Sequence, residues 1–384
     1  MKILIIHTEY TQPGGEDTVV SQEANLLKQK HNVKTLLFKN RKGLAGFFQF
    51  AISIWNIRSA FIVRSQIKEF KPDIIHLHNW HFASGPIVIR VANKMGVPII
   101  NTLHNYRLIC PSGILLNNNQ LFLDSINQSF PWSAISKKAY KNSIILSFWL
   151  AVVVWFHRKI KTWEMVSTYL CLTPSAIDLF TDSWMAPLKN KFRSKPNFTI
   201  SEKSLNEKIK KRGNHFIYIG RLSEEKGLKL LIDAFQQLPY QLKIAGDGPL
   251  KEDVIKATTN SNISYLGTLN SAEVSNELSI ANALIFPSIW FETFGLVITE
   301  AFSNSCAVLS TNIGAPKSIV NNGINGFCFE SNNIESLKET IRYWEALPIL
   351  QKEEIRSNAL NTYKEKYSPT NQHKYFDEIY RKVL

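Results

Sequence analysis

The sequence predicts an α/β protein made of two doubly wound, Rossmann-like domains. Three observations predict this class. The 384 residues exceed what one ordinary hydrophobic core needs and suit two domains of under about 200 residues each. Short β-branched apolar runs alternate with helical stretches in both halves, which is typical of parallel βαβ units. With 45% hydrophobic and 20% charged residues, the composition is that of an ordinary globular chain.

The first half begins in strand–helix order and then departs from it. Strands are expected over residues 3–7, 33–38, 73–77 and 98–103, and a helix over 16–30. Residues 105–165 interrupt the alternation with an Asn-rich loop at 117–119 and a long helical segment from about residue 136. Alternation resumes beyond residue 165, where Pro174 suits the first turn of a helix.

A basic segment separates the two halves. Between Lys189 and Arg212 there are nine Lys or Arg residues and two acids. We interpret this segment as a linker whose charges are solvated, with a binding patch as the alternative.

The second half repeats the α/β alternation. Strands are expected over residues 216–219, 242–245, 263–266, 283–286, 307–310 and 327–329, and helices over 226–237, 249–258, 271–281 and 296–303. Each strand ends in Gly, Pro or a polar residue. These turns therefore lie at the carboxyl edge of the sheet, where open α/β sheets bind ligands.

The segment from Pro287 to Ala301 carries the strongest functional pattern. A strand ends at Pro287, a loop carries Glu292, and a helix begins near residues 294–296 with Glu300 in its first turns. Exposed amide groups at such a helix start form an anion site. The two carboxylates could hold sugar and ribose hydroxyls on either side of a bound phosphate. The alternative is that both are exposed acids that complement the helix dipole.

Two further strand-end turns support an anion site. Arg221 and Lys226 lie in a loop bounded by Gly220 and Gly227, directly after a strand. Two cations in this position suit a diphosphate, at about 1.5–3 kcal/mol for each charge-assisted contact. A solvated turn with an ordinary ion pair is the alternative. The turn at 246–249, Gly-Asp-Gly-Pro, is a weak signal by itself because Asp-Gly turns are common.

Taken in order, these motifs resemble the retaining glycosyltransferases of family 4, which have the GT-B fold. The resemblance implies that the two Rossmann-like domains face each other across a cleft. The second half carries G-R-L-x-x-E-K-G, then G-D-G-P, then P-S-x-x-E-x-F-G-L-V-x-x-E-A. The first half agrees through Gly14-Gly15-Glu16, His76-Leu77-His78, the Thr-Leu-His-Asn-Tyr-Arg of residues 102–107 and the Ile-Cys-Pro of residues 109–111. The resemblance is to the branch that builds capsules, O-antigens and exopolysaccharides. It implies transfer of a hexose-type sugar from a nucleotide-sugar donor to a saccharide or lipid-linked acceptor, with retention of anomeric configuration.

The resemblance also implies roles for residues of the second half. Arg221 and Lys226 would neutralise the donor diphosphate, helped by the amides of Phe294, Gly295 and Leu296. Glu292 would contact the transferred sugar and Glu300 the ribose. Residues 196–367 would thus form the donor-binding domain.

In the first half, residues 1–195 would bind the acceptor, and a last helix over 368–384 would cross back onto this domain. Gly15 would let the backbone approach the phosphate or the acceptor, and His104 would lie near the reacting carbon. We expect His76 and His78 on opposite sides of a strand, which makes them structural residues and poor joint metal ligands.

No metal or other cofactor is expected. Metal-dependent glycosyltransferases generally present an Asp-x-Asp pair, and the sequence contains none. The charge of the leaving diphosphate would instead be met by Arg221, Lys226 and the helix start. The chain departs from the family pattern at Ala315 and Ser318, where a Gly and a Glu are common, and residues 117–133 lack the cysteines common in that branch.

A net charge of +14 predicts an anionic partner. Aromatic and aliphatic residues at 47–57 lie among cations at 41, 42, 58 and 64, and the apolar run 144–156 is flanked by further cations. That run reaches roughly 20 Å, too short for about 30 Å of bilayer hydrocarbon. We interpret it as a helix buried in the protein or across the cleft mouth, with a helix resting partly on a membrane interface, or true insertion, as the alternatives. We expect a cytoplasmic protein with reduced cysteines and a peripheral contact with anionic lipid at the inner face of the membrane. The alternative is that the aromatics fill the core.

Other functions remain alternatives at this point. A nucleotide-sugar epimerase or a phosphorylase shares the fold, although the family-4 loops argue against both. A non-catalytic protein that binds nucleotide-sugars or nucleic acid is suggested by the charge alone. Nucleic acid is not expected as a partner, because no recognised module or face of interleaved aromatics and cations is evident.

Overall fold

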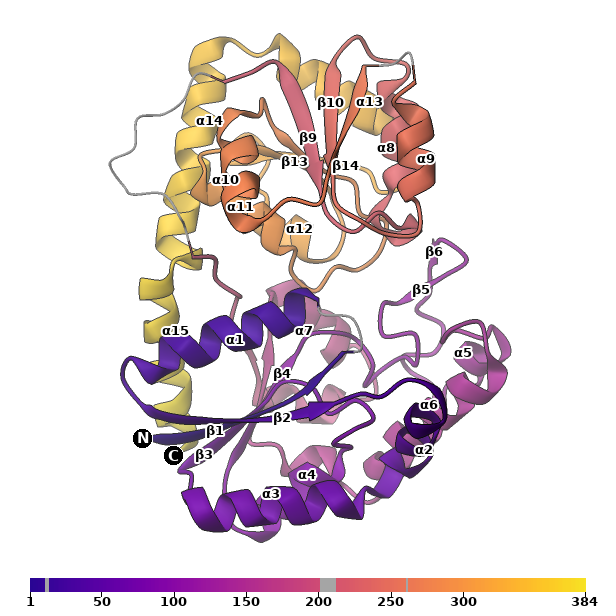
Figure 1. Ribbon diagram of the computed structural model, residues 1–384, viewed down its shortest axis with the longest axis vertical. Helices are drawn as coiled ribbons and strands as arrows, with labels where there is room; N and C mark the ends of the chain where they lie inside the picture. The colour runs from indigo at the N-terminus through magenta and orange to yellow at the C-terminus, as the bar shows by residue number, and fades with distance from the viewer. Residues whose placement is uncertain (11–13, 201–211, 260–261) are drawn as a thin grey trace. The chain divides into compact units, whose positions relative to one another are not determined.

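The computed structural model describes residues 1–10, 14–200, 212–259 and 262–384 (Figure 1). The chain forms two compact units. The first contains residues 1–117, 122–196 and 372–384, and the second contains 118–121 and 197–371. The sequence places the boundary between 195 and 196; the binding roles assigned to the two domains stay predictions.

The first unit is built on a six-stranded parallel sheet in the order β2-β1-β3-β4-β7-β8. The strands are β1 (Lys2–Glu9), β2 (Asn32–Lys39), β3 (Ile74–Leu77), β4 (Ile99–Leu103), β7 (Thr168–Cys171) and β8 (Phe192–Ser194). From β1 the chain runs outward to β2 and then returns to β3 on the other side. The strand order therefore reverses between β1 and β3, where doubly wound sheets open a crevice at their carboxyl edge.

Helices connect and cover these strands. They are α1 (Gly15–Lys28), α2 (Gly43–Ile52), α3 (Ile57–Phe70), α4 (Ile87–Lys94), α5 (Trp132–Ser136), α6 (Ile144–Lys159) and α7 (Pro174–Thr181). A small two-stranded sheet of β5 (Leu116–Asn117) and β6 (Gln120–Leu121) lies at the Asn-rich loop. The prediction of one long helix from residue 136 is wrong. Lys138, Lys141 and Asn142 adopt positive φ, and the Ser143 hydroxyl accepts from the Leu146 amide (3.3 Å) to start α6 afresh.

The structure also corrects the interpretation of residues 189–212 as a solvated linker. Residues 192–194 form β8 rather than a loop, and the following Lys195 is fully buried against Glu23. Arg212, at the other end, donates to the carbonyls of Leu278 (2.8 Å) and Ser305 (2.5 Å). Residues 201–211 of the predicted linker lie outside the described residues.

The second unit has a six-stranded parallel sheet in the order β11-β10-β9-β12-β13-β14. Its strands are β9 (His215–Ile219), β10 (Gln241–Ala245), β11 (Ile263–Gly267), β12 (Leu284–Phe286), β13 (Val308–Thr311) and β14 (Gly326–Phe329). Each lies where the sequence predicts a strand, because each is a short apolar run that ends at a turn residue. The strand order reverses between β9 and β12.

The helices of the second unit bury their apolar faces on this sheet. They are α8 (Leu228–Phe235), α9 (Lys251–Ala257), α10 (Ser271–Ile280), α11 (Leu296–Ser303), α12 (Gly314–Ile319), α13 (Ile334–Ala346) and α14 (Ile349–Thr362). The switch point of this sheet is the place between β9 and β12 where the strand order reverses. One hydrophobic core extends to both sides of it and includes the buried residues Phe216, Leu231, Ile285 and Leu309.

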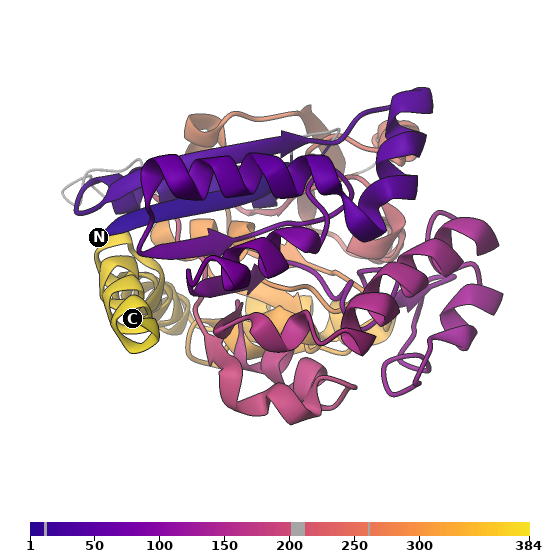
Figure 2. The same cartoon turned by 90° about the horizontal axis from the view of Figure 1, so that it is seen from below.

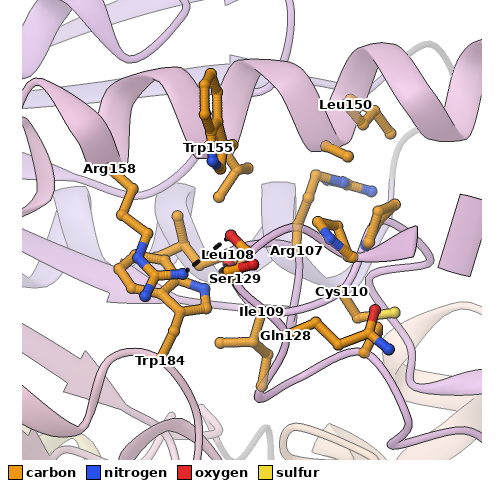
Figure 3. Close-up of a pocket in the computed structure, with 15 residues that line it drawn as sticks. Arg107, Leu108, Ile109, Cys110, Gln128, Ser129, Leu150, Trp155, Arg158 and Trp184 are labelled. Atoms are coloured by element: carbon orange, nitrogen blue, oxygen red, sulfur yellow. Dashed lines mark hydrogen bonds between the residues drawn. The ribbon is translucent and has the colours of Figure 1, made fainter. Parts of the chain in front are cut away.

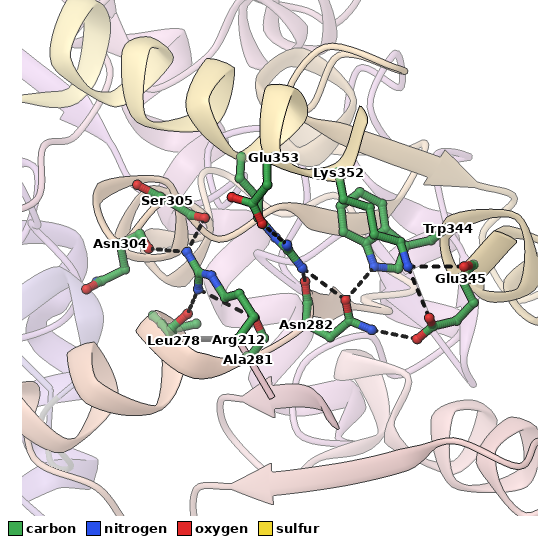
Figure 4. A network of polar contacts seen from close by, with 11 residues as sticks. Arg212, Leu278, Ala281, Asn282, Asn304, Ser305, Trp344, Glu345, Lys352 and Glu353 are labelled. Atoms are coloured by element: carbon green, nitrogen blue, oxygen red, sulfur yellow. Dashed lines mark hydrogen bonds and ion pairs between the residues drawn. The ribbon is translucent and has the colours of Figure 1, made fainter. Parts of the chain in front are cut away.

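A polar network fastens α13 and α14 to the start of β12 (Figure 4). The side-chain oxygen of Asn282 accepts from the Trp344 indole (3.0 Å), and its backbone oxygen accepts from Arg356 (2.8 Å). The side-chain amide of Asn282 donates to the Glu345 carboxylate (2.5 Å), which also accepts a hydrogen bond from the Lys352 ammonium (3.1 Å). This network holds the amino end of β12, whereas the loops at its carboxyl end carry the motifs.

The last helix, α15 (Pro369–Val383), ends in the first unit. The Tyr380 hydroxyl lies 2.8 Å from the His76 Nδ1 atom of β3, and Phe376 and Tyr380 are buried. Accordingly, the two termini lie side by side in both views (Figures 1 and 2).

Among the described residues, no single helix is both long and apolar enough to cross a membrane. One bent pair, residues 43–55 and 57–70, meets the length and composition criteria, with an angle of 69° between its parts.

Candidate functional site

Two loops of the second unit meet at the switch point of its sheet. One follows β9 and carries Arg221 and Lys226, and the other follows β12 and carries Glu292. The Lys226 ammonium pairs with the Glu292 carboxylate across this point. The same carboxylate oxygen accepts from the Ser288 hydroxyl (2.7 Å). The Glu292 side chain is 6% exposed and that of Lys226 is 23% exposed. The carboxylate is therefore buried beneath the two loops, and the ammonium lies nearer the surface.

A glycine allows the two loops to approach. Gly227 adopts φ +68°, and a Cβ atom at this position would lie 2.0 Å from the Pro287 carbonyl oxygen. Beside it, the Ile289 amide donates to the Glu225 carbonyl (3.0 Å). The final Gly of the first motif is therefore needed for contact with the second.

The Gly-Asp-Gly-Pro turn packs against the same loop. The Leu222 amide donates to the Asp247 carbonyl (2.9 Å). A Cβ atom on Gly246 would lie 1.8 Å from the Gly220 carbonyl oxygen, which leaves room for hydrogen only. The turn that is a weak signal in the sequence thus supports the loop that carries Arg221.

The start of α11 completes this edge. Gly295 adopts φ +91° and leads into α11, while Phe294 is buried with its ring 5.9 Å from that of Tyr367. Burial raises the pKa of the Glu300 carboxyl, which lies on the second turn of α11. Arg221 is exposed, and its carbonyl accepts from the buried Tyr218 hydroxyl (2.7 Å). The predicted donor residues of the second half therefore gather at one edge of this unit, whereas Gly15 belongs to the first unit.

The loop after β13 holds the backbone of Glu292. The Ala315 amide donates to the Glu292 carbonyl (2.9 Å), and a Cβ atom on Gly314 (φ +60°) would lie 2.8 Å from the Glu292 nitrogen. Ala315 departs from the family pattern, yet its backbone contributes to the site. This contact was not predicted from the sequence, and neither was the hydrogen bond from Ser288 to Glu292.

In the first unit, His104 follows β4 and lies beside His78. The His104 Nε2 atom is 3.0 Å from His78 Nδ1, and the two rings stack with centroids 5.3 Å apart. The expectation that His76 and His78 face opposite sides is wrong. Residues two apart on a strand share a face, and these rings stack at 4.2 Å.

The atoms of Glu23, His76 and His78 lie close enough to hold a metal ion, within 4.8 Å of one another. However, both ring nitrogens of His76 already have partners, the hydroxyls of Tyr380 (2.8 Å) and Thr102 (2.7 Å). The Glu23 carboxylate pairs with the Lys195 ammonium. This set of contacts favours a hydrogen-bonded cluster over a metal centre.

The end of β1 holds a second polar group that sequence reasoning missed. His7 Nε2 lies 2.8 Å from the Asp17 carboxylate, which also accepts from the Gly14 amide (2.8 Å) and so caps α1. Burial raises the pKa of the neighbouring Glu16 carboxyl to about 8, whereas contacts with Tyr10 and the charge of Arg107 lower it. Gly15, the predicted approach point, is exposed at the first position of α1.

A pocket of the first unit opens between the loop after β4 and helix α6 (Figure 3). Its walls are largely apolar, with the cations Arg107 and Arg158. Arg158 lies over the Trp184 ring (4.8 Å), whose indole donates to the Leu108 carbonyl (2.9 Å). An apolar pocket with a few charged groups suits an amphipathic ligand.

Comparison with known proteins agrees with this geometry. Residues 14–164 match the family model "Glycosyltransferase Family 4", and residues 200–362 match "Glycosyl transferases group 1". A sulfoquinovosyl transferase of Arabidopsis thaliana is 28% identical over 72% of this chain and 51% of its own length. An O-antigen chain mannosyltransferase of Escherichia coli is 27% identical over 33% of this chain and 36% of its own length. The matches thus span about half or less of these curated relatives.

Among solved structures, the Anabaena protein HepE in complex with UDP-glucose aligns over 100% of both chains, with a TM-score of 0.66 and 16% identity. At this identity the likeness concerns the fold alone. The two family models together cover most of the chain, each on one of the two sheets. The chain therefore belongs to the family-4 glycosyltransferases, and its two doubly wound units are those of the GT-B fold.

Proposed function

We propose that the protein is a glycosyltransferase that moves a hexose-type sugar from a nucleotide-sugar donor to a saccharide or lipid-linked acceptor in cell-surface polysaccharide or glycolipid synthesis. The observation that carries this proposal is the Lys226–Glu292 pair at the switch point of the second sheet. It unites a cation for a diphosphate and a carboxylate for sugar hydroxyls where such sheets bind ligands.

The proposed chemistry is electrostatic. Arg221, Lys226 and the amides at the start of α11 would stabilise the negative charge that grows on the diphosphate as the glycosidic bond breaks. Glu292 would bind the transferred sugar and Glu300 the ribose. We propose that no metal takes part, because these cations supply the positive charge.

We further propose retention of anomeric configuration, as the family resemblance implies. The acceptor oxygen would attack on the face from which the diphosphate leaves, and a phosphate oxygen would take the hydroxyl proton. His104 of the first unit would contact the sugar near the reacting carbon. The pocket beside α6 would receive the acceptor, since its two arginines suit a phosphorylated or lipid-linked group.

A peripheral membrane contact is supported by the surface of α2 and α3. Phe50 is buried, but Phe47, Phe48 and Phe61 are 61–68% exposed. Other exposed apolar side chains of the same segment are Leu44, Ile52, Trp55 and Ile57. The cations of this segment, Arg41, Lys42, Arg58 and Arg64, are exposed as well, and the chain has no acid between residues 24 and 68. Exposed aromatics among exposed cations suit anionic lipid, so we propose that the enzyme works at the inner face of the cytoplasmic membrane.

A radiolabelled-donor assay tests the proposed activity against its rivals. Transfer of label to a saccharide or lipid acceptor is expected. Conversion of the free nucleotide-sugar to an epimer, or phosphate-dependent release of sugar phosphate, would instead identify an epimerase or a phosphorylase. Binding without turnover would identify a non-catalytic binding protein.

A further inference from the structure

A fully buried ion pair lies under the carboxyl edge of the first sheet. Glu23 of α1 and Lys195, which follows β8, are both 0% exposed and in direct contact. The Lys195 ammonium also lies 4.6 Å from the centre of the Phe376 ring of α15, a cation–π contact. Burying two charges is costly unless further hydrogen bonds use them.

The second oxygen of Glu23 faces a histidine that leads to His104. Glu23 Oε2 lies 3.6 Å from His78 Nε2. On the other side of that ring, His78 Nδ1 lies 3.0 Å from His104 Nε2. All these atoms belong to the first unit, and Glu23 and His78 are buried. A row of polar groups thus runs from Lys195 through Glu23 and His78 to His104, in which the 3.6 Å contact between Glu23 and His78 is longer than a hydrogen bond and acts through the charge of the carboxylate.

The chemistry of neutral imidazole fixes where the protons lie in this row. A neutral histidine has one N–H donor and one acceptor nitrogen. A carboxylate beside Nε2 favours the proton on that atom, as carboxylate–histidine pairs do in other sites. His78 Nδ1 is then an acceptor, and the atom that approaches it, His104 Nε2, must carry the hydrogen.

We infer that Glu23 is a positioning residue that, through His78, holds His104 as the tautomer protonated on Nε2. The Nδ1 atom of His104 is then an acceptor, so it receives a hydrogen bond from a hydroxyl or amide and cannot donate one. The role of His104 toward a sugar rests on the proposed function, whereas its tautomer does not.

The surroundings keep the ring neutral. Burial, with the charges of Lys195 and His7, lowers the pKa of His104 to about 3, and burial lowers those of His76 and His78 as well. The tautomer, rather than the charge, is therefore what Glu23 controls near neutral pH.

The test is nitrogen-15 NMR of the full chain with labelled histidine rings, with His104 assigned by comparison with a His104→Gln variant. The wild type should show His104 with its proton on Nε2. The double variant E23M/K195M replaces the pair by apolar side chains of similar length and leaves no lone buried charge. It should move the His104 ring to a mixture of the two tautomers. Tyr380→Phe is the matched control, because it alters a partner of His76 and leaves the row to His104 intact; its His104 signals should not change.

Two results would overturn the inference: a wild-type His104 protonated on Nδ1, or an unchanged tautomer in the folded double variant. If that variant does not fold, His78→Phe breaks the same row, and the wild-type spectrum decides by itself. The measurement needs no substrate. An inactive protein with the expected His104 tautomer would count against the proposed function and leave this inference standing.

Discussion

Lys226 and Glu292 are 66 positions apart in the chain, and their side chains form an ion pair across the point where the strand order of the second sheet reverses. Each residue belongs to a different motif of the family. Their contact makes the two motifs one site, and it shows why Gly227, which lets the loops approach, belongs to the first motif.

Replacing Lys226 by Ala should lower kcat/KM by about tenfold to a few hundredfold, because one charge-assisted contact with the diphosphate is worth roughly 1.5–3 kcal/mol. Steady-state kinetics of the purified variant measure this. Lys229→Ala is the control, since Lys229 is exposed and pairs with Glu224. Equal kinetics for wild type and a folded Lys226→Ala protein would remove Lys226 from the donor site.

Activity should persist in EDTA. The proposed site meets the diphosphate charge with Arg221, Lys226 and the start of α11, so chelation removes nothing from it. Turnover is measured with and without chelator. Complete loss that Mg²⁺ or Mn²⁺ restores would contradict this mechanism.

Gly227→Ala should destabilise the second unit more than Gly267→Ala does. Both glycines have positive φ, which costs an alanine about 1–2 kcal/mol. Only at Gly227 would the new Cβ atom meet a backbone oxygen, at 2.0 Å, whereas nothing lies within 4 Å at Gly267. Overpacking adds about 1–3 kcal/mol. Urea unfolding compares the two variants. Equal denaturation midpoints would show that the loops can move apart to accept the Cβ atom at little cost in stability.

Glu16 should make stability depend on pH. Its folded pKa of about 8 lies above the ordinary value of 4.5, so the folded state binds the extra proton. The free energy of unfolding should therefore fall as pH rises from about 4.5 to about 8, by a few kcal/mol.

Glu16→Gln removes this titration, so the stability of the variant relative to wild type should rise across the same window in urea unfolding. Glu69→Gln is the control. Glu69 is exposed, and its hydrogen bond and ion pair with Lys34 lower its pKa, so it should give no such rise. A pH-independent difference between wild type and Glu16→Gln would place the Glu16 pKa at its ordinary value.

The membrane surface can be tested by liposome flotation. The protein should float with anionic vesicles at low salt and less so at high salt. Exchanging the exposed Phe47 and Phe48 for Ser should weaken flotation, whereas exchanging the exposed Tyr343 of the second unit should not. Equal recovery in the soluble fraction with neutral and anionic vesicles would rule out the contact.

The fold could be predicted in large part from the sequence, because parallel strands buried on both faces are continuous apolar runs. Two segments of the structure differ from the prediction, because they depend on individual contacts that leave no periodic pattern in the sequence. The break before α6 depends on Asn142 and Ser143, and β8 depends on burying Phe192 next to Lys195.

The candidate site was predictable where one motif holds both the side chain and its glycine, as with Lys226 and Gly227. Pairs that join distant segments were not. In the sequence, Lys195 is one of nine cations in a basic stretch, and nothing distinguishes it from the others. Its partner Glu23 lies 172 positions away on a helix, so the pair could not be predicted.

We propose that a nucleotide-sugar diphosphate binds at the junction of the loops after β9 and β12. Calorimetric titration with UDP-, GDP-, ADP- and dTDP-sugars tests it most directly, with wild type compared with an Arg221→Ala/Lys226→Ala double variant. One class of donor should bind the wild type, and the folded double variant should lose that binding. Undiminished binding to the double variant, or none of the four classes binding the wild type, would contradict the claim.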